Sequence, residues 1–114
     1  MDAHEARVVL VTAPDEAVAR DLARALVEER LAACGNIVPA VTSIFRWQGE
    51  VQQESEVLVV LKTSAERFAA LRTRVLELHP YDVPEVISLA VEAGHQPYLD
   101  WLGGCLTAGR SDGT

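Results

Sequence analysis

The chain has 114 residues, of which 49% are hydrophobic and 24% charged, a composition typical of a soluble globular protein. This length suits one domain with its own core, but not a catalytic domain joined to a separate binding domain. Seventeen acidic and ten basic residues give a formal charge of −7. Because the basic residues are scattered along the chain, a surface that follows nucleic-acid phosphates is not expected.

Targeting and membrane signals are absent from the sequence pattern. The first residues show no basic region followed by an apolar run, and no segment approaches the roughly 18 apolar residues of a membrane span. The two cysteines, Cys34 and Cys105, are too few for a disulfide framework and form no CxxC pair. We therefore expect a cytoplasmic protein with no membrane partner, whose cysteines are thiols.

The first two predicted elements are a strand and a helix. Residues 7–13 are apolar and rich in β-branched side chains, which predicts a buried strand ended by Pro14. Pro14 suits the first turn of a helix, and the apolar spacing extends that helix to about Ala33. Gly35 or Asn36 can adopt the left-handed conformation that ends it.

A long β-hairpin is predicted next. Residues 37–47 are dense in Val, Ile, Thr and aromatic residues, residues 48–50 form a turn signal, and a second strand-like run ends at residue 61. The first arm is about twice the usual strand length of roughly 5 to 6 residues. We expect it to project beyond the sheet, with Pro39 marking an edge or a bulge.

The last part of the chain predicts a helix, a strand and a short helix. Thr63 or Ser64 can cap the second helix, which ends before Pro80. Residues 86–91 form the fourth strand and residues 97–106 the final helix.

The order βαββαβ plus a terminal helix predicts an α+β, ferredoxin-like fold with a four-stranded antiparallel sheet. We expect one domain over residues 1–114, with an ordered core at about 7–106 and a flexible tail at 107–114.

The connection before the fourth strand reads HPYDVPE over residues 79–85. Its two prolines restrict the backbone, so an imidazole, a phenol and two carboxylates are held on a stiff loop. Such a loop suits catalysis, ligand or metal binding, or only a turn that directs the next strand. Asp82 and Glu85 share no helical face, so paired acid and base catalysis is weakly supported.

Five segments in register resemble the CutA divalent-cation tolerance proteins. They read LVEERLAACGNI, SIFRWQGE, KT, HPYDVPE and YLDWL, at residues 26–37, 43–50, 62–63, 79–85 and 98–102. Together they cover nearly the whole chain in the family's order. One departure is Gly35, where the family more often has valine or another bulky residue, and we expect looser packing there.

The resemblance implies a ferredoxin-like subunit in a tight homotrimer, with hairpin arms that pair between subunits and with Phe45, Arg46 and Trp47 at the interface. A long exposed hairpin is an aggregation hazard unless partners cover its edges, and a closed three-fold ring would cover them. The family is linked to tolerance of copper and other divalent cations and has no established catalytic activity. We therefore predict a copper-binding or divalent-cation-binding protein that is not an enzyme.

His79 and Cys34 are the candidate metal ligands. Imidazole is a common ligand for divalent transition metals, and thiolate is a soft ligand for copper. Alternatively, His79 hydrogen-bonds the backbone and Cys34 is a small core residue. Both follow helices that we expect to return to the same end of the sheet, which would bring them together within a subunit or across an interface.

A small-molecule site is the alternative prediction. The family is similar in architecture to the PII signalling proteins, which suggests an anionic ligand in clefts between subunits near Lys62, Tyr81 and Glu85. Lys62 ends an otherwise apolar strand, and we expect it either to hold that ligand or to form a salt bridge with Glu85.

Overall fold

The structure is a computed structural model that describes residues 1–107 of the chain. Its elements follow the expected order: η1 (Ala3–Glu5), β1 (Ala6–Ala13), α1 (Glu16–Glu28), β2 (Cys34–Trp47), β3 (Glu50–Ser64), α2 (Ala65–Leu78), β4 (Ile87–Ala90) and α3 (Gln96–Cys105). The predicted tail at 107–114 lies, from residue 108 onward, outside the described residues.

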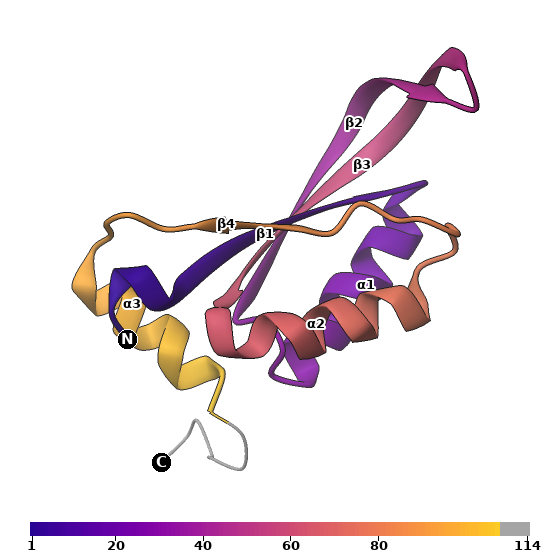
Figure 1. The fold of residues 1–114 in the computed structure, drawn as a ribbon. Helices are drawn as coiled ribbons and strands as arrows, with labels where there is room; N and C mark the ends of the chain where they lie inside the picture. The colour runs from indigo at the N-terminus through magenta and orange to yellow at the C-terminus, as the bar shows by residue number, and fades with distance from the viewer. Residues whose placement is uncertain (108–114) are drawn as a thin grey trace.

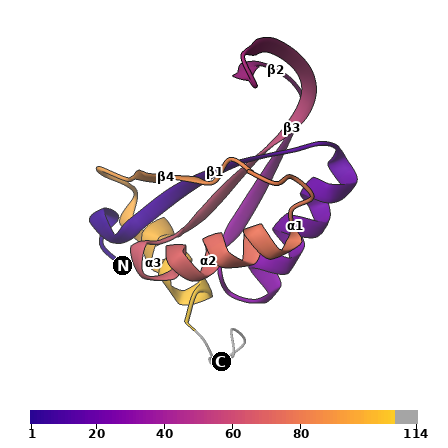
Figure 2. The ribbon, with the colours of Figure 1, turned by 45° about the vertical axis from the view of Figure 1, so that its right-hand side comes forward.

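The four strands form one antiparallel sheet in the order β2-β3-β1-β4, and α1 and α2 lie together on one face of it (Figures 1 and 2). This confirms the predicted ferredoxin-like fold. The core lies between the sheet and the two helices, because alternate strand residues point to this face. Its fully buried side chains include Val9, Val11, Val59, Leu61, Leu26, Leu71 and Val75.

The other face of the sheet is also apolar. Val8, Leu10, Leu58 and Val60 alternate with the buried core residues, and each remains partly exposed in the single chain. A solvated face of an antiparallel sheet normally carries polar residues. This composition is typical of a face that packs against another surface.

The hairpin of β2 and β3 projects beyond the sheet, as predicted (Figure 1). β1 pairs with β3 only as far as Ala13 and Val57, whereas β2 and β3 stay paired out to Trp47 and Glu50. Gln48 (φ 51°) and Gly49 (φ 82°) form the two-residue turn, which suits the twist of a tight hairpin.

The predicted irregularity at Pro39 is confirmed as a break in register. The pairing of β2 with β3 shifts between Val38 and Val41, and Ala40 takes a left-handed conformation (φ 60°). A proline cannot donate to the ladder, so a bulge is where a strand accommodates one.

α1 ends earlier than predicted, at Glu28 and not near Ala33. Arg30 takes the left-handed conformation (φ 60°) that we expected of Gly35 or Asn36, and the Leu31 N–H donates to Leu26 O (2.9 Å). Thr63 Oγ1 then donates to Leu31 O (2.6 Å). Residues 29–33, which their helical pattern assigned to α1, therefore form the turn that leads into β2.

Gly35 sits in β2 beneath α1, and the expected loose packing there is not found. A Cβ atom at this position would lie 3.1 Å from Ala23 Cβ and 3.2 Å from Leu61 Cδ2. Real Cβ contacts are rarely so short, so the glycine lets helix and strand approach closely.

The remaining elements match the predicted pattern with small shifts. Ser64 caps α2 by accepting a hydrogen bond from the Arg67 N–H (3.1 Å), and α2 ends at Leu78, before Pro80. β4 is two residues shorter than predicted. No helix within residues 1–107 combines the length and apolar character needed to cross a membrane.

Candidate functional site

His79 is the C-cap of α2 and is buried, with 7% of its surface exposed. Its Nε2–H donates to Thr12 O (2.7 Å) and its Nδ1 accepts from the Tyr81 N–H (3.1 Å). Because a carbonyl only accepts and an amide N–H only donates, this pattern requires the neutral Nε2–H tautomer. Both ring nitrogens are thus engaged, Nε2 with β1 and Nδ1 within the loop, and metal binding would require one of them to release its partner.

Tyr81 connects the same loop to the root of the hairpin. Its Oη donates to Glu56 Oε2 (2.8 Å), and its ring lies 4.6 Å from the His79 ring, centroid to centroid. Burial, followed by the hydrogen bond to Glu56, raises the pKa of Tyr81 to about 12. The phenol is therefore a neutral hydrogen-bond donor at physiological pH.

An open cleft of about 900 Å³ lies between the hairpin root and the 79–85 loop. One part of its lining is apolar and comes from the hairpin, including Phe45 and Trp47. Its acidic part comes from both the hairpin and the loop and comprises Glu54, Glu56, Asp82 and Glu85. The cleft therefore favours a cationic or neutral occupant over an anionic one.

Cys34 and Lys62 lie together at the other end of the sheet. They are paired partners on β2 and β3, and both lie beside Asn36, whose Oδ1 accepts a hydrogen bond from Lys62 Nζ. Cys34 Sγ makes a long contact of 3.9 Å to the same oxygen. The ammonium group of Lys62 thus bonds to Asn36 in place of the expected salt bridge to Glu85.

The expectation that Cys34 and His79 share one end of the sheet is wrong within a single chain. His79 contacts Thr12, whose strand partner is Leu58, four positions along β3 from Lys62. At about 3.4 Å per residue, this separates the two groups by roughly 13 Å along the sheet. The reason is topological: α1 runs toward the end where β3 finishes, and α2 starts there and runs back.

The same separation divides the predicted ligand-binding set. Tyr81 and Glu85 line the acidic cleft, whereas Lys62 lies at the opposite end of the sheet. A site that uses all three residues therefore requires two chains.

The predicted interface residues lie on the projecting hairpin. Trp47 is 49% exposed and Phe45 39%, and Arg46 Nη1 donates to Gly49 O at the tip (3.4 Å). Ile44 and Val51 are more exposed still, at 67% and 64%. These side chains extend past the core of their own chain, so they are available to another surface.

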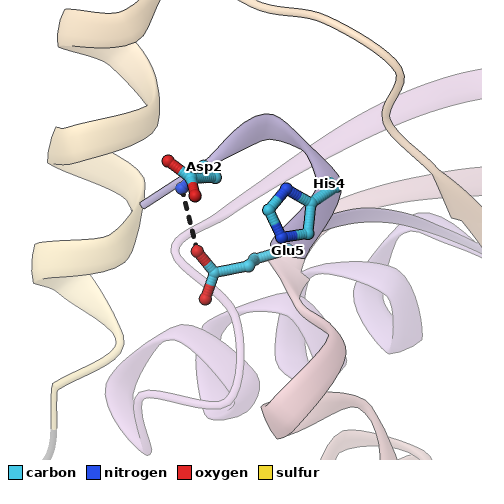
Figure 3. A group of neighbouring side chains, drawn as sticks. All are labelled: Asp2, His4 and Glu5. Carbon is cyan, nitrogen blue, oxygen red and sulfur yellow. Dashed lines mark hydrogen bonds between the residues drawn. The ribbon is translucent and has the colours of Figure 1, made fainter.

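A candidate cation-binding group that sequence reasoning missed is the trio Asp2, His4 and Glu5 around η1 (Figure 3). Within residues 1–107 it alone brings three or more His, Cys, Asp or Glu ligand atoms within 4.8 Å of one another. All three side chains are exposed, and Glu5 Oε1 accepts from the Asp2 N–H (3.0 Å). The two carboxylates thus serve first as caps of the short helix.

Glu54 and Glu56 of the cleft were also missed by sequence reasoning. Their alternation on one strand places both carboxylates on the same face, which is a signal the sequence carries. That this face meets the 79–85 loop follows only from the fold.

The fold and the site define an α+β domain with an acidic cleft and an exposed hairpin. The chain belongs to the CutA1 divalent ion tolerance protein family, whose model matches residues 7–104. It is 58% identical over 95 residues to the divalent-cation tolerance protein CutA of Thermus thermophilus, covering 83% of this chain and 92% of that protein.

Solved structures agree with this assignment. The divalent cation tolerance protein of Thermus thermophilus matches with a TM-score of 0.84 and 57% identity, covering 85% of this chain and 94% of that chain. A CutA from Archaeoglobus fulgidus, described as periplasmic, matches with a TM-score of 0.87 and 33% identity, covering 90% and 99%. Against the mouse CutA protein, 51% identical over 92 residues, the chain spans about half of the relative's length (52%).

Proposed function

We propose that this chain acts in the cytoplasm as a homotrimer that binds copper or other divalent cations and thereby contributes to tolerance of them. The proposal includes no catalytic reaction, because His79 and Tyr81 of the loop are used in hydrogen bonds that hold the loop in place.

The observation that carries the proposal is the apolar surface left uncovered in one chain. The hairpin exposes Ile44, Trp47 and Val51 far beyond the core, and the sheet face opposite α1 and α2 is also apolar. Exposed apolar surface of this extent is typical of an interface. A closed ring of three chains would cover the face and the unpaired edge of the distal β3 at once.

Cys34 is the better placed of the two predicted metal ligands. It is half-buried, and its neighbour Asn36 supplies an amide oxygen beside it. Thiolates select copper over the harder divalent cations. His79 supports the site less well, because binding through Nδ1 would break the hydrogen bond from the Tyr81 N–H.

Isothermal titration with Cu(I) and Cu(II) tests the cation-binding part. We expect Cys34→Ser to weaken binding and His95→Gln to serve as a matched control with little effect, because His95 is exposed and its side chain makes no cap hydrogen bond. If a Cys34→Ser/His79→Gln double variant binds copper as tightly as the parent protein, the site assignment is wrong.

A second candidate function is a PII-like signalling module that binds a small anionic ligand between subunits. The acidic lining of the cleft opposes an anion there, but one relationship favours this candidate: Lys62 and the Tyr81–Glu85 loop lie at opposite ends of the same sheet. A head-to-tail ring could therefore bring Lys62 of one chain to the loop of the next. A thermal-shift screen of anionic metabolites tests this candidate, with any stabilisation expected to disappear in Lys62→Ala.

A further inference from the structure

The acidic cleft between the hairpin root and the 79–85 loop contains no positive charge of its own. Glu54 and Glu56 of β3 and Asp82 and Glu85 of the loop line it, and no lysine, arginine or histidine does. Within residues 1–107, none of these carboxylates forms an ion pair. Negative charges that line one cavity without a partner attract cations to it.

Glu56 is the most informative of these residues, because it is a charged residue in a buried position. Only 8% of its surface is exposed. Its Oε2 accepts the hydrogen bond from Tyr81 Oη (2.8 Å), and its Oε1 has no hydrogen-bond partner within residues 1–107. Every fully buried side-chain oxygen in that part of the chain has a partner, so Oε1 is accessible from the cleft that Glu56 lines. A carboxylate in such surroundings is costly to leave without a countercharge, and water screens its charge poorly.

The pKa of Tyr81 responds to the same negative charges. Burial is the largest cause that raises this pKa to about 12, followed by the hydrogen bond and charge of Glu56 and then by the charges of Glu54 and Asp15. Asp15 is the N-cap of α1. Negative charge from β3 and from the start of α1 is therefore concentrated where the loop meets the hairpin.

The hairpin side of the cleft also offers two aromatic rings. Phe45 and Trp47 alternate along β2, so both lie on one face of the hairpin. Glu54 pairs with Ser43 and is therefore a diagonal neighbour of Phe45 on that face. Aromatic rings attract cations to their π-electron faces and also cover aliphatic carbon. Aromatic rings beside a carboxylate are thus suited to an organic cation.

A single metal ion fits the cleft less well. The carboxylates of the cleft do not bring three ligand oxygens within 4.8 Å of one another, a spacing that within residues 1–107 occurs only around η1. A Ca²⁺ ion takes about six to eight oxygen ligands. The cavity volume of about 900 Å³ lies within the roughly 300–1,000 Å³ of small-molecule sites. Charges spread over two walls of such a cavity suit an extended cation.

We propose that the acidic cleft binds an extended organic cation of the aliphatic polyamine class. One ammonium group pairs with Glu56 Oε1 on the hairpin and a second with the loop carboxylates, while the methylene chain between them packs on Phe45 and Trp47. This inference goes beyond the proposed function, because it uses neither Cys34 nor Lys62. It is also an alternative to the anionic ligand of the second candidate function.

Isothermal titration of the 114-residue chain with spermine tests the proposal, at physiological ionic strength, where scattered surface charges are largely screened. Glu56→Gln keeps an acceptor for Tyr81 and should weaken spermine binding more than roughly tenfold, since a desolvated ion pair is lost. Asp82→Asn, on the exposed loop, should weaken binding up to roughly fivefold. Glu28→Gln removes the same charge from an exposed position on α1, outside the cleft, and should leave the affinity unchanged.

Three results would overturn the proposal. The first is a parent protein that does not bind spermine, which includes the case of a cation from another chain already filling the cleft. The second is an equal loss of affinity in Glu28→Gln and Glu56→Gln, which would show attraction to the net charge of −7 alone. The third is displacement of spermine by an equal concentration of Mg²⁺ or Ca²⁺, which would show a site for inorganic cations.

Copper titrations separate this inference from the proposed function. Glu56→Gln should bind copper like the parent protein, and Cys34→Ser should bind spermine like the parent protein. Failure of copper binding therefore leaves the polyamine site standing, and the reverse also holds. Circular dichroism and thermal melts establish whether Glu56→Gln is folded, and Asp82→Asn gives the result if it is not.

Discussion

Tyr81 Oη donates a hydrogen bond of 2.8 Å to Glu56 Oε2 and so joins the loop after α2 to the root of the hairpin. His79 supports the same loop from beneath, through Thr12 O and the Tyr81 N–H. The proline-containing loop at residues 79–85 therefore connects α2 to β1 and to the hairpin through side-chain hydrogen bonds. Its position decides where the acidic cleft lies.

Alkaline pH should weaken the connection between the loop and the hairpin, because ionised Tyr81 can no longer donate its hydrogen bond to Glu56. The folded-state pKa of Tyr81, about 12, lies above the ordinary tyrosine value of 10.0, so the neutral phenol is favoured in the folded protein. The resulting stability is fully present below pH 10 and is lost as the pH rises through about 12. An ultraviolet absorbance titration of a Tyr98→Phe variant isolates Tyr81, and ionisation near pH 10 would contradict the hydrogen bond.

Tyr81→Phe should lower the free energy of unfolding by about 1 kcal/mol, the usual net value of one hydrogen bond. The measurement is thermal unfolding at a fixed protein concentration, because the proposed assembly would make the midpoint depend on concentration. The alkaline loss of stability should also become smaller in this variant. An unchanged pH profile would show that Glu56 and Tyr81 do not interact in solution.

His79→Ala should destabilise the fold by about 2–4 kcal/mol, because it leaves Thr12 O and the Tyr81 N–H without their side-chain partner. His79→Gln keeps one donor and one acceptor and should cost less. Chemical unfolding followed by tryptophan fluorescence measures both. If His79→Ala is as stable as the parent protein but binds less copper, His79 is a metal ligand and its hydrogen bonds do not stabilise the fold.

Gly35→Ala should destabilise by about 1–3 kcal/mol, since the added Cβ on β2 overpacks against Ala23 of α1 and the Leu61 side chain. Gly104→Ala is the matched control in α3, because nothing lies within 4 Å of its added Cβ and alanine favours helix. Thermal melts of the two variants should shift in opposite directions. Equal shifts would argue against close packing at Gly35.

Sequence reasoning reached the fold because apolar spacing, Pro14, Ser64 and Pro80 all mark true element boundaries. The predicted end of α1 was wrong, because the helical pattern of residues 29–33 gives no sign that Thr63 Oγ1 donates a hydrogen bond to Leu31 O. Tertiary contacts override local propensity in this way.

The candidate site was harder to predict than the fold. Residue types pointed correctly to a structured loop at His79, but not to the use of both ring nitrogens by the backbone. The distance between His79 and Cys34 depends on the direction of two helices relative to one sheet, which no local pattern contains. Their roles as metal ligands stay predictions.

Ile44→Glu should weaken assembly, because a carboxylate placed in an apolar interface loses its hydration without gaining a partner. Ile44 is 67% exposed on the hairpin, so the substitution should leave the fold of each chain unchanged. Leu76→Glu is the control, since Leu76 is also exposed (52%) but lies on α2. Size-exclusion chromatography with light scattering measures the molar masses of the two variants. Equal masses would contradict a role for the hairpin in the interface.

Sedimentation equilibrium of the parent protein tests the central claim most directly, namely that other copies of the chain cover the hairpin and the apolar sheet face. Three chains of 12.4 kDa should sediment together as a single species of about three times that mass over a wide concentration range. A stable species of 12.4 kDa would contradict the account. It would remove the proposed trimer and any ligand site shared between chains.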